Sequence, residues 1–192
     1  MDTLKQRLTK RPPKNGKFYL IAIDGRGGSG KTELLKHIEA LLPGFVMING
    51  DDYFEPVEDS IAWGDFNDER FIKDVIEPLK AGETVLRYRP YDWHAEPHIS
   101  EKTLKITKGV CIERSFVFDF ELDWDLKIWV EVLGDISRER GIARDDMPRE
   151  RAEKQWREVW QPKEDAHIKK HNPMETADIV IDGTKPFDEQ LM

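Results

Sequence analysis

Short apolar runs alternate along the chain with longer segments in which apolar and charged residues are interleaved. The apolar runs have the length of strands, and they predict strands near 18–23, 45–48, 84–88, 109–113, 126–131 and 178–181. The interleaved segments predict helices at 33–42, 68–80, 135–143 and 148–171, with a break in the last at Gln161-Pro162. Strands and helices that alternate in this way are typical of α/β proteins.

Several of the strand-like runs are apolar at every position, including residues 20–23 and 128–130. A strand of this kind is buried on both faces, as in a parallel sheet that helices cover on both sides. A chain of 192 residues is long enough for one sizeable core and short for two domains. We therefore expect a single α/β domain over residues 1–192 with a central, mostly parallel sheet flanked by helices.

A glycine-rich segment, G-R-G-G-S-G-K-T at residues 25–32, stands directly between the first strand and the first long helix. Glycines allow backbone N–H groups to surround an anion, and the helix N-terminus adds its positive end. Lys31 is expected to reach the outer phosphates of a nucleoside triphosphate, and the Thr32 hydroxyl is expected to hold Mg²⁺. The pattern predicts the phosphate loop of a P-loop NTPase fold. The predicted nucleotide-binding residues are Gly27, Gly28, Ser29, Gly30, Lys31 and Thr32.

A second polar motif, running from Asn49 through Asp51 to Phe54, follows the second predicted strand. The helix at 33–42 descends by about 15 Å, and the next strand climbs back by about the same distance. The motif should therefore emerge at the rim that holds the phosphate loop, where ligands of such sheets bind. A solvated turn also explains Gly-Asp-Asp, but this placement favours Asp51 as a catalytic carboxylate.

Further candidates follow in the second half of the chain. Glu113 ends a predicted strand, where an acid can hold Mg²⁺ through water, although a surface glutamate explains it nearly as well. Arginines on a predicted helix can close over a nucleotide and stabilise the transferring phosphoryl group. We expect Arg140 and Arg144 to act in this way. They belong to residues 138–171, which are expected to form a helical lid and the helices that follow it.

Charge and composition narrow the class of protein. Charged residues make up 35% of the chain and the net charge is −8, which argues against nucleic acid as the main partner. No apolar stretch reaches the length of a membrane span, and the single cysteine, Cys111, predicts a buried thiol in a reducing compartment. We expect a cytoplasmic protein without a membrane partner, and a basic leader of unassigned role at residues 1–16. The chain lacks the Asn-Lys-x-Asp motif of GTPases and a strand that ends in Asp-Glu as in motor ATPases.

Five motifs occur in an order that resembles one family. They are Ile23 to Thr32, Asp51-Asp52-Tyr53-Phe54, Tyr91-Asp92-Trp93, Arg140 to Asp145, and Ala177 to Asp182. Nearly the whole chain is similar to the uridine kinase branch of the P-loop small-molecule kinases, which includes nicotinamide riboside kinase and phosphoribulokinase. This resemblance implies ATP- and Mg²⁺-dependent phosphorylation of a hydroxyl on a small metabolite, often a nucleoside.

The resemblance also implies roles for individual residues. Asp51 corresponds to the acid that accepts the proton of the acceptor hydroxyl, and Lys31 neutralises the transferring group. The residues expected to contact the acceptor are Tyr53, Asn67, Tyr91, Trp93, Arg149 and Gln155.

Three departures from the family pattern leave the acceptor open. An Asn-Phe-Asp turn is replaced by Asp65-Phe66-Asn67, Glu96 stands where a base-reading histidine is expected, and Glu113-Arg114 replaces Glu-Gly. A uridine- or cytidine-like nucleoside is the first expectation. Nicotinamide riboside, pantothenate, a sugar phosphate or an antibiotic hydroxyl are alternatives, and so is a non-catalytic nucleotide-binding switch. The sequence leaves the oligomeric state open, a homo-oligomer included.

Two further patterns are expected to be structural. The pairs His94/His98 and His167/His171 have the spacing of paired metal ligands, but surface histidines are favoured over a zinc site. Trp156 and Trp160 lie one helical turn apart, which favours packing in the core or lid over stacking on a nucleobase.

Overall fold

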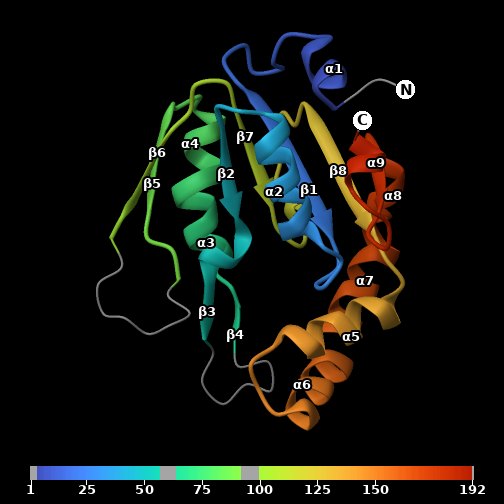
Figure 1. Ribbon diagram of the computed structural model, residues 1–192. Helices are drawn as coiled ribbons and strands as arrows, with labels where there is room; N and C mark the ends of the chain where they lie inside the picture. Colours follow the sequence, from blue (N-terminus) through green and yellow to red (C-terminus); the bar gives the residue numbers. More distant parts are fainter. Residues whose placement is uncertain (1–3, 57–63, 92–99, 192) are drawn as a thin grey trace.

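A five-stranded parallel sheet forms the centre of the computed structural model, which describes residues 4–56, 64–91 and 100–191 (Figure 1). Its strand order is β2-β7-β1-β8-β9, and every neighbouring pair is parallel. This confirms the predicted fold class, and five of the six predicted strands form this sheet. The strands are β1 (Tyr19–Gly25), β2 (Phe45–Asn49), β7 (Gly109–Glu113), β8 (Leu126–Glu131) and β9 (Ile179–Asp182).

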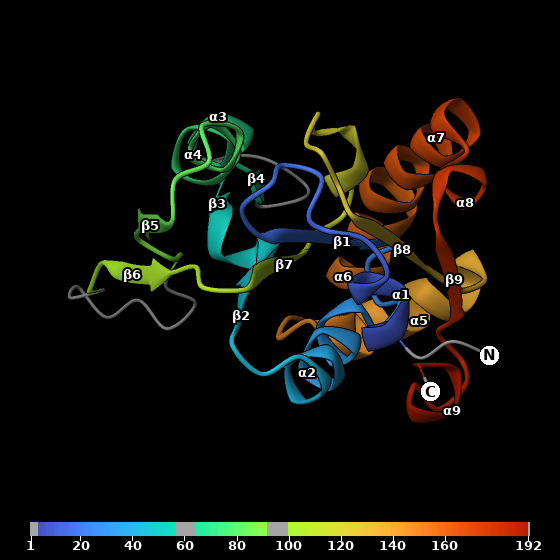
Figure 2. The same cartoon turned by 90° about the horizontal axis from the view of Figure 1, so that it is seen from above.

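The sixth predicted strand, β5 (Val85–Tyr88), lies outside this sheet and pairs antiparallel with β6 (Lys102–Lys105). A second antiparallel pair joins β3 (Phe54–Pro56) to β4 (Gly64–Phe66). Both pairs lie to one side of the main sheet (Figure 2). The pattern of apolar residues missed β3, β4 and β6 because these strands are only three or four residues long, and β6 is also largely solvent-facing.

The helices match the predicted positions. Two of them, α2 (Lys31–Leu41) and α5 (Gly134–Arg144), are regular. The other two contain a π-helical segment each. One comprises α3 (Asp68–Phe71), η2 (Ile72–Ile76) and α4 (Glu77–Lys80), and the other comprises α6 (Arg149–Gln155), η4 (Trp156–Trp160) and α7 (Gln161–His171). Shorter elements are α1 (Leu4–Thr9), η1 (Gly50–Tyr53), η3 (Val117–Asp119), α8 (Pro173–Thr176) and α9 (Asp188–Leu191).

The predicted break at Gln161-Pro162 is wrong, because Gln161 keeps helical angles of φ −61° and ψ −46°. A proline lacks the N–H of a helical hydrogen bond, and its ring pushes away the carbonyl of the preceding turn. A π-helical segment widens that turn and relieves the clash. In this chain both π segments end two residues before a proline, Pro78 in one case and Pro162 in the other.

Alternate residues of β1 face two separate hydrophobic clusters. Leu20 and Ala22 belong to the cluster under α3 and α4, whereas Ile21 and Ile23 belong to the cluster under α2. These helices lie on opposite sides of the sheet (Figure 2). Cys111 is fully buried in the second cluster, as predicted.

The basic leader contains α1. Leu4 and Leu8 of this helix are buried in the cluster under α2, so the segment packs on the helical layer outside the sheet. Among the described helices, none has the length and apolar character that crossing a bilayer requires.

Candidate active site

The phosphate loop connects the end of β1 to the first turn of α2. Gly28 and Gly30 have φ angles of +72° and +102°, a left-handed conformation that favours glycine. The loop is also approached closely from α5, because a Cβ on Gly28 would lie 2.4 Å from the carbonyl oxygen of Ser137. Lys31 is buried, and its ammonium group donates to the carbonyls of Gly25 at 2.9 Å and Arg26 at 2.8 Å. The loop therefore has the tight, glycine-dependent curvature of an anion-binding nest.

An oxygen-rich group lies beside this loop. Glu113, buried at the end of β7, accepts a hydrogen bond from the Thr32 hydroxyl at 2.9 Å. Burial raises the pKa of Glu113 to about 7, Lys31 opposes this shift, and the charge of Asp51 adds to it. The hydroxyl of Thr32 and the carboxylates of Glu113 and Asp51 form the kind of donor set that Mg²⁺ prefers. Thr32 and Glu113 thus fit the predicted metal site.

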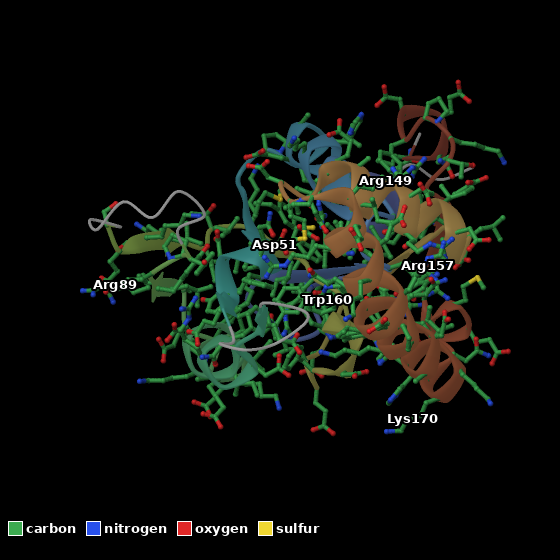
Figure 3. The ribbon with its side chains drawn as sticks, turned by 90° about the horizontal axis from the view of Figure 1, so that it is seen from below. Asp51, Arg89, Arg149, Arg157, Trp160 and Lys170 are labelled. Carbon is green, nitrogen blue, oxygen red and sulfur yellow. The ribbon has the colours of Figure 1, made fainter. Side chains whose placement is uncertain are left out.

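Asp51 is the second residue of η1, which follows β2 directly, and it lies at the same edge of the sheet as Glu113. Its N–H donates to the side-chain oxygen of Asn49 at 2.8 Å, which holds the turn in place. Seen from the carboxyl edge of the sheet, Asp51 lies between the β3–β4 pair and the lid helices, where Trp160 is labelled (Figure 3). The structure therefore brings Asp51 to the edge of the sheet that holds Glu113 and the phosphate loop, as the length argument predicts. Their catalytic roles stay predictions.

The lid helices pack directly on the phosphate loop. Trp156 is buried, and its ring lies where a Cβ on Gly27 or on Gly141 would be, at 2.7 Å and 2.0 Å. Its indole N–H donates to Asp145 at 2.8 Å, and the Ser137 hydroxyl donates to the Gly27 carbonyl at 2.6 Å. The expectation that this tryptophan packs in the lid is confirmed.

Glu164 on α7 is a contact that sequence reasoning missed. Its carboxylate accepts a hydrogen bond from the Gly27 N–H at 2.6 Å, and burial raises its pKa. Arg26 of the loop pairs with Glu164 at 3.6 Å and with Asp165 at 2.6 Å. A buried carboxylate thus occupies an N–H group of a loop that is expected to bind phosphate. The available signal was spacing, since Glu164 continues the i, i+4 series that begins with Trp156 and Trp160.

The two predicted lid arginines lie in different surroundings. Arg140 donates to the Gly183 carbonyl at 2.9 Å and borders a cavity of about 360 Å³ between Gly30, His37 and Phe187. Arg140 therefore lies beside the phosphate loop at a cavity, and its expected role over the transferring phosphoryl group stays a prediction. Arg144 is exposed and pairs with Asp145 at 3.2 Å, and its charge lowers the pKa of Glu113.

Two predicted acceptor-binding residues have structural contacts instead. Tyr53 is fully buried, with its ring 5.1 Å from that of Phe71 and 4.8 Å from the Arg70 guanidinium. Asn67 caps α3, because its side-chain oxygen accepts the Arg70 N–H at 2.8 Å. Tyr53 has no exposed surface and the side-chain oxygen of Asn67 is used by a helix end, so the expected contacts of both residues with an acceptor stay predictions. The sequence around Tyr53 and around Asn67 is typical of a turn, and a turn pattern does not predict burial in the core or a helix cap.

The neighbouring residues of the same region are tied to one another. The Asp52 carboxylate accepts from the Tyr88 hydroxyl at 2.8 Å and from Lys102 at 2.9 Å, so it anchors the β5–β6 pair. Tyr91 is partly exposed, donates its N–H to the Asp52 carbonyl at 2.7 Å and meets Phe54 edge-on. The predicted acceptor residue Trp93 lies outside the described residues, as do Glu96, His94 and His98.

Arg114 does not face the metal site. Its buried guanidinium lies over the rings of Phe66, Phe71 and Phe120 at 4.5, 4.9 and 5.1 Å, and it pairs with Asp68. The Arg114 guanidinium is therefore held by three aromatic rings on the acceptor side.

The last two predicted contacts lie on the lid. Arg149 is exposed and bridges Glu139 and Glu153, each at 2.9 Å (Figure 3). Gln155 is buried at the C-terminal end of α6. In this conformation Arg149 joins α5 to α6, and its expected contact with the acceptor stays a prediction.

The phosphate loop, the parallel sheet and the helical lid together define a P-loop kinase fold. Among solved structures, a protein described as a possible uridine kinase from Bacillus stearothermophilus has a TM-score of 0.66 at 18% identity, covering 93% of this chain and 94% of that one. A protein named as a fructose transport system kinase from Silicibacter sp. TM1040 has a TM-score of 0.68, also at 18% identity, covering 92% and 94%.

Sequence comparison identifies the branch. Uridine kinases of Borrelia turicatae and Borrelia hermsii are 30% and 28% identical to the chain over 140 and 139 residues. Each match covers 66% of this chain and 66% of the relative, so about a third of each relative lies outside it. No protein-family profile matches. The chain belongs to the uridine kinase-like branch of the P-loop small-molecule kinases.

Proposed function

We propose that the protein is an ATP-dependent kinase that phosphorylates a hydroxyl group of a small metabolite, with a uridine- or cytidine-like nucleoside as the expected acceptor. The observation that carries this proposal is that Asp51 and Glu113 lie at one edge of the sheet, where the charges of Asp51 and Lys31 both act on Glu113. The relatives named uridine kinase support the same reaction class.

The donor nucleotide would be held by the loop from Gly27 to Thr32. Backbone N–H groups and the N-terminus of α2 would bind its phosphates, and Lys31 would balance the charge of the outer ones. Thr32 and Glu113 would hold Mg²⁺, which when bound neutralises charge on the phosphate oxygens.

The acceptor would be activated from the opposite side of the candidate site. Asp51 would accept the proton of the acceptor hydroxyl while that oxygen forms its bond to the γ-phosphorus and the bond to the β-phosphate oxygen breaks, releasing ADP. General-base assistance of this kind contributes about 10²- to 10⁴-fold in rate. Asp51 suits the role because it is partly exposed, whereas the carboxylate of Asp52 is occupied by Tyr88 and Lys102.

The lid would keep water away from the transferring group. Trp156 and Ser137 already contact the loop at Gly27, so α5 and η4 form an apolar cover over it. Arg144, at the end of α5, would add positive charge near Glu113 as the phosphoryl group moves.

A panel of acceptors tests the proposal. Purified protein with ATP and Mg²⁺ is assayed for ADP release with uridine, cytidine, nicotinamide riboside, pantothenate, a sugar phosphate and an aminoglycoside. Acceptor-stimulated release that chelation of Mg²⁺ abolishes supports the kinase assignment, and the best acceptor identifies the substrate class. Tight ATP binding without stimulation by any acceptor favours a non-catalytic switch.

A further inference from the structure

Three potential metal ligands from distant parts of the sequence lie together beside α7. Asp119 ends η3, the turn that follows β7, and His167 and His171 are one turn apart near the end of α7. Nδ1 of His167 is 3.5 Å from one oxygen of the Asp119 carboxylate, and Nδ1 of His171 is 3.8 Å from the other. One potential ligand atom from each residue lies within 4.8 Å of those of the other two.

These separations suit a shared ion better than hydrogen bonds. An N–H···O hydrogen bond is about 2.9 Å long, and the two contacts of Asp119 are longer. Two ligands that each lie about 2.1 Å from the same metal ion are separated by about 3 to 4 Å. The three side chains therefore lie within reach of one shared ion, and the carboxylate is farther from each imidazole than a hydrogen bond requires.

The histidine rings are held in position by their neighbours. The ring of His167 packs against that of Phe116 at 4.3 Å and against that of His171 at 4.6 Å, and its side chain is only 10% exposed. Asp119 and His171 are more exposed, so their side chains can move by the short distance that coordination requires. One oriented ligand and two adjustable ligands are a workable basis for a metal site.

We propose that Asp119, His167 and His171 bind a divalent transition-metal ion of the zinc, cobalt or nickel class, with water in the remaining positions. Two imidazoles and one carboxylate favour such ions over Mg²⁺, which prefers oxygen ligands. This donor set distinguishes the site from the oxygen-rich group of Thr32 and Glu113.

The ion would join the lid to the sheet. Phe116 and Phe118, which flank the start of η3, donate their N–H groups to Asp24 at the end of β1 at 2.9 and 3.1 Å. On the other side, α7 carries Glu164, which contacts the phosphate loop. A bound ion would therefore fasten the last lid helix to the turn beside that loop.

Metal titration of the tag-free full chain tests the site, with excess Mg²⁺ present to fill the oxygen-rich group. Visible absorption of bound Co²⁺ gives ligand type and stoichiometry, and competition with a chromophoric chelator gives the Zn²⁺ affinity. The wild type should bind a single Co²⁺ through nitrogen and oxygen ligands. The substitutions Asp119→Asn and His171→Gln should each weaken Zn²⁺ binding by about 100-fold or more.

His37→Gln is the matched control, because His37 also lies near two carboxylates, Glu33 at 3.9 Å and Asp188 at 3.6 Å, but without a second histidine. It should retain Zn²⁺ binding. As a second readout, Zn²⁺ should raise the thermal midpoint of the wild type and not that of His171→Gln, whose metal-free midpoint reports on its folding. Absence of tight Zn²⁺ binding in the wild type, unchanged binding in both ligand variants, or loss of binding only in the control would each overturn the proposal.

Discussion

The donor side and the acceptor side of the candidate site are built differently. On the donor side, the nucleotide-binding loop is one contiguous segment whose backbone does the binding, braced by buried contacts with Trp156 and Ser137. On the acceptor side, β3–β4, β5–β6 and α3 come from separate segments, and polar side chains there bond to one another. The curvature of a backbone cradle is set by its own glycine-rich segment, whereas the role of a polar side chain depends on which partners the fold brings to it.

The largest expected effect separates the two adjacent acids at the boundary of these two sides. Asp51→Asn should lower kcat by about 10²- to 10⁴-fold, because the acceptor hydroxyl loses its proton acceptor. ATP affinity should stay within a few-fold. The matched substitution Asp52→Asn should keep most of kcat, since that carboxylate serves Tyr88 and Lys102. Steady-state ADP release and ATP binding measure both, and equal losses in the two variants would contradict the assignment.

The donor side should also show a distinctive pH dependence of stability. Asp24 accepts N–H groups of Gly25, Phe116 and Phe118, yet burial raises its pKa from 3.8 to about 6. The folded state holds this proton more tightly than the unfolded chain. The contribution of Asp24 to stability is therefore fully present below about pH 4 and is lost as the pH rises through about 6, a change of about 3 kcal/mol.

Asp24→Asn, which cannot titrate, isolates this effect. The free energy of unfolding of the wild type minus that of the variant should fall between pH 4 and pH 7, as measured by urea denaturation. A difference that is constant or rises over this range would contradict the assigned pKa shift.

The lid contact can be tested with a single methyl group. Gly141 lies under Trp156, and a Cβ there would be 2.0 Å from the indole ring. Alanine stabilises an exposed helix by up to about 1 kcal/mol relative to glycine, but here overpacking should cost about 1 to 3 kcal/mol. Urea denaturation measures the change. Combining Gly141→Ala with Trp156→Phe should recover part of the loss, and simple additivity would argue against direct contact.

A substitution at Glu164 should have a smaller effect on the donor side, and it should strengthen ATP binding. Its buried carboxylate accepts the Gly27 N–H, and a phosphate arriving at the loop would meet this negative charge. Glu164→Gln removes the charge, so it should tighten ATP binding roughly tenfold. Asp165→Asn, at the exposed partner of Arg26, should change ATP affinity much less. Calorimetry with both variants decides the point, and weaker binding to Glu164→Gln would refute it.

The smallest effect concerns the acceptor side. Asn67→Ala should cost about 1 kcal/mol of stability, because the side chain caps α3, and should leave kcat/KM within a few-fold. Asn67→Asp keeps a capping oxygen and should be near wild type in stability. A large increase in acceptor KM without loss of stability would return Asn67 to the substrate site.

Local patterns predicted the donor side well. Short sequence patterns predicted the phosphate loop and the strand and helix that flank it. They also predicted that Glu113 lies at the end of a strand. The placement of Asp51 also follows locally, because one helix and one strand of matched length lead back to the same edge.

Contacts between distant residues were not predictable in the same way. Glu164 meets Gly27 across 137 positions of the chain. Asp119 comes beside His167 and His171 only because η3 follows β7 next to α7, which is why the histidine pair was expected to be an ordinary surface feature. Tyr53 and Asn67 had the right residue types for a ligand but were used by the core and by a helix end.

The order of residues alone determined that this protein is an α/β P-loop protein with a cradle for phosphate, because strand and helix periods and a glycine-rich turn depend on near neighbours. Only the tertiary structure decided which polar side chains remain available in the candidate site and which are consumed by packing. The physical reason is that each hydrogen-bonding group pairs with whatever folding brings within about 3 Å, and sequence does not specify that distance.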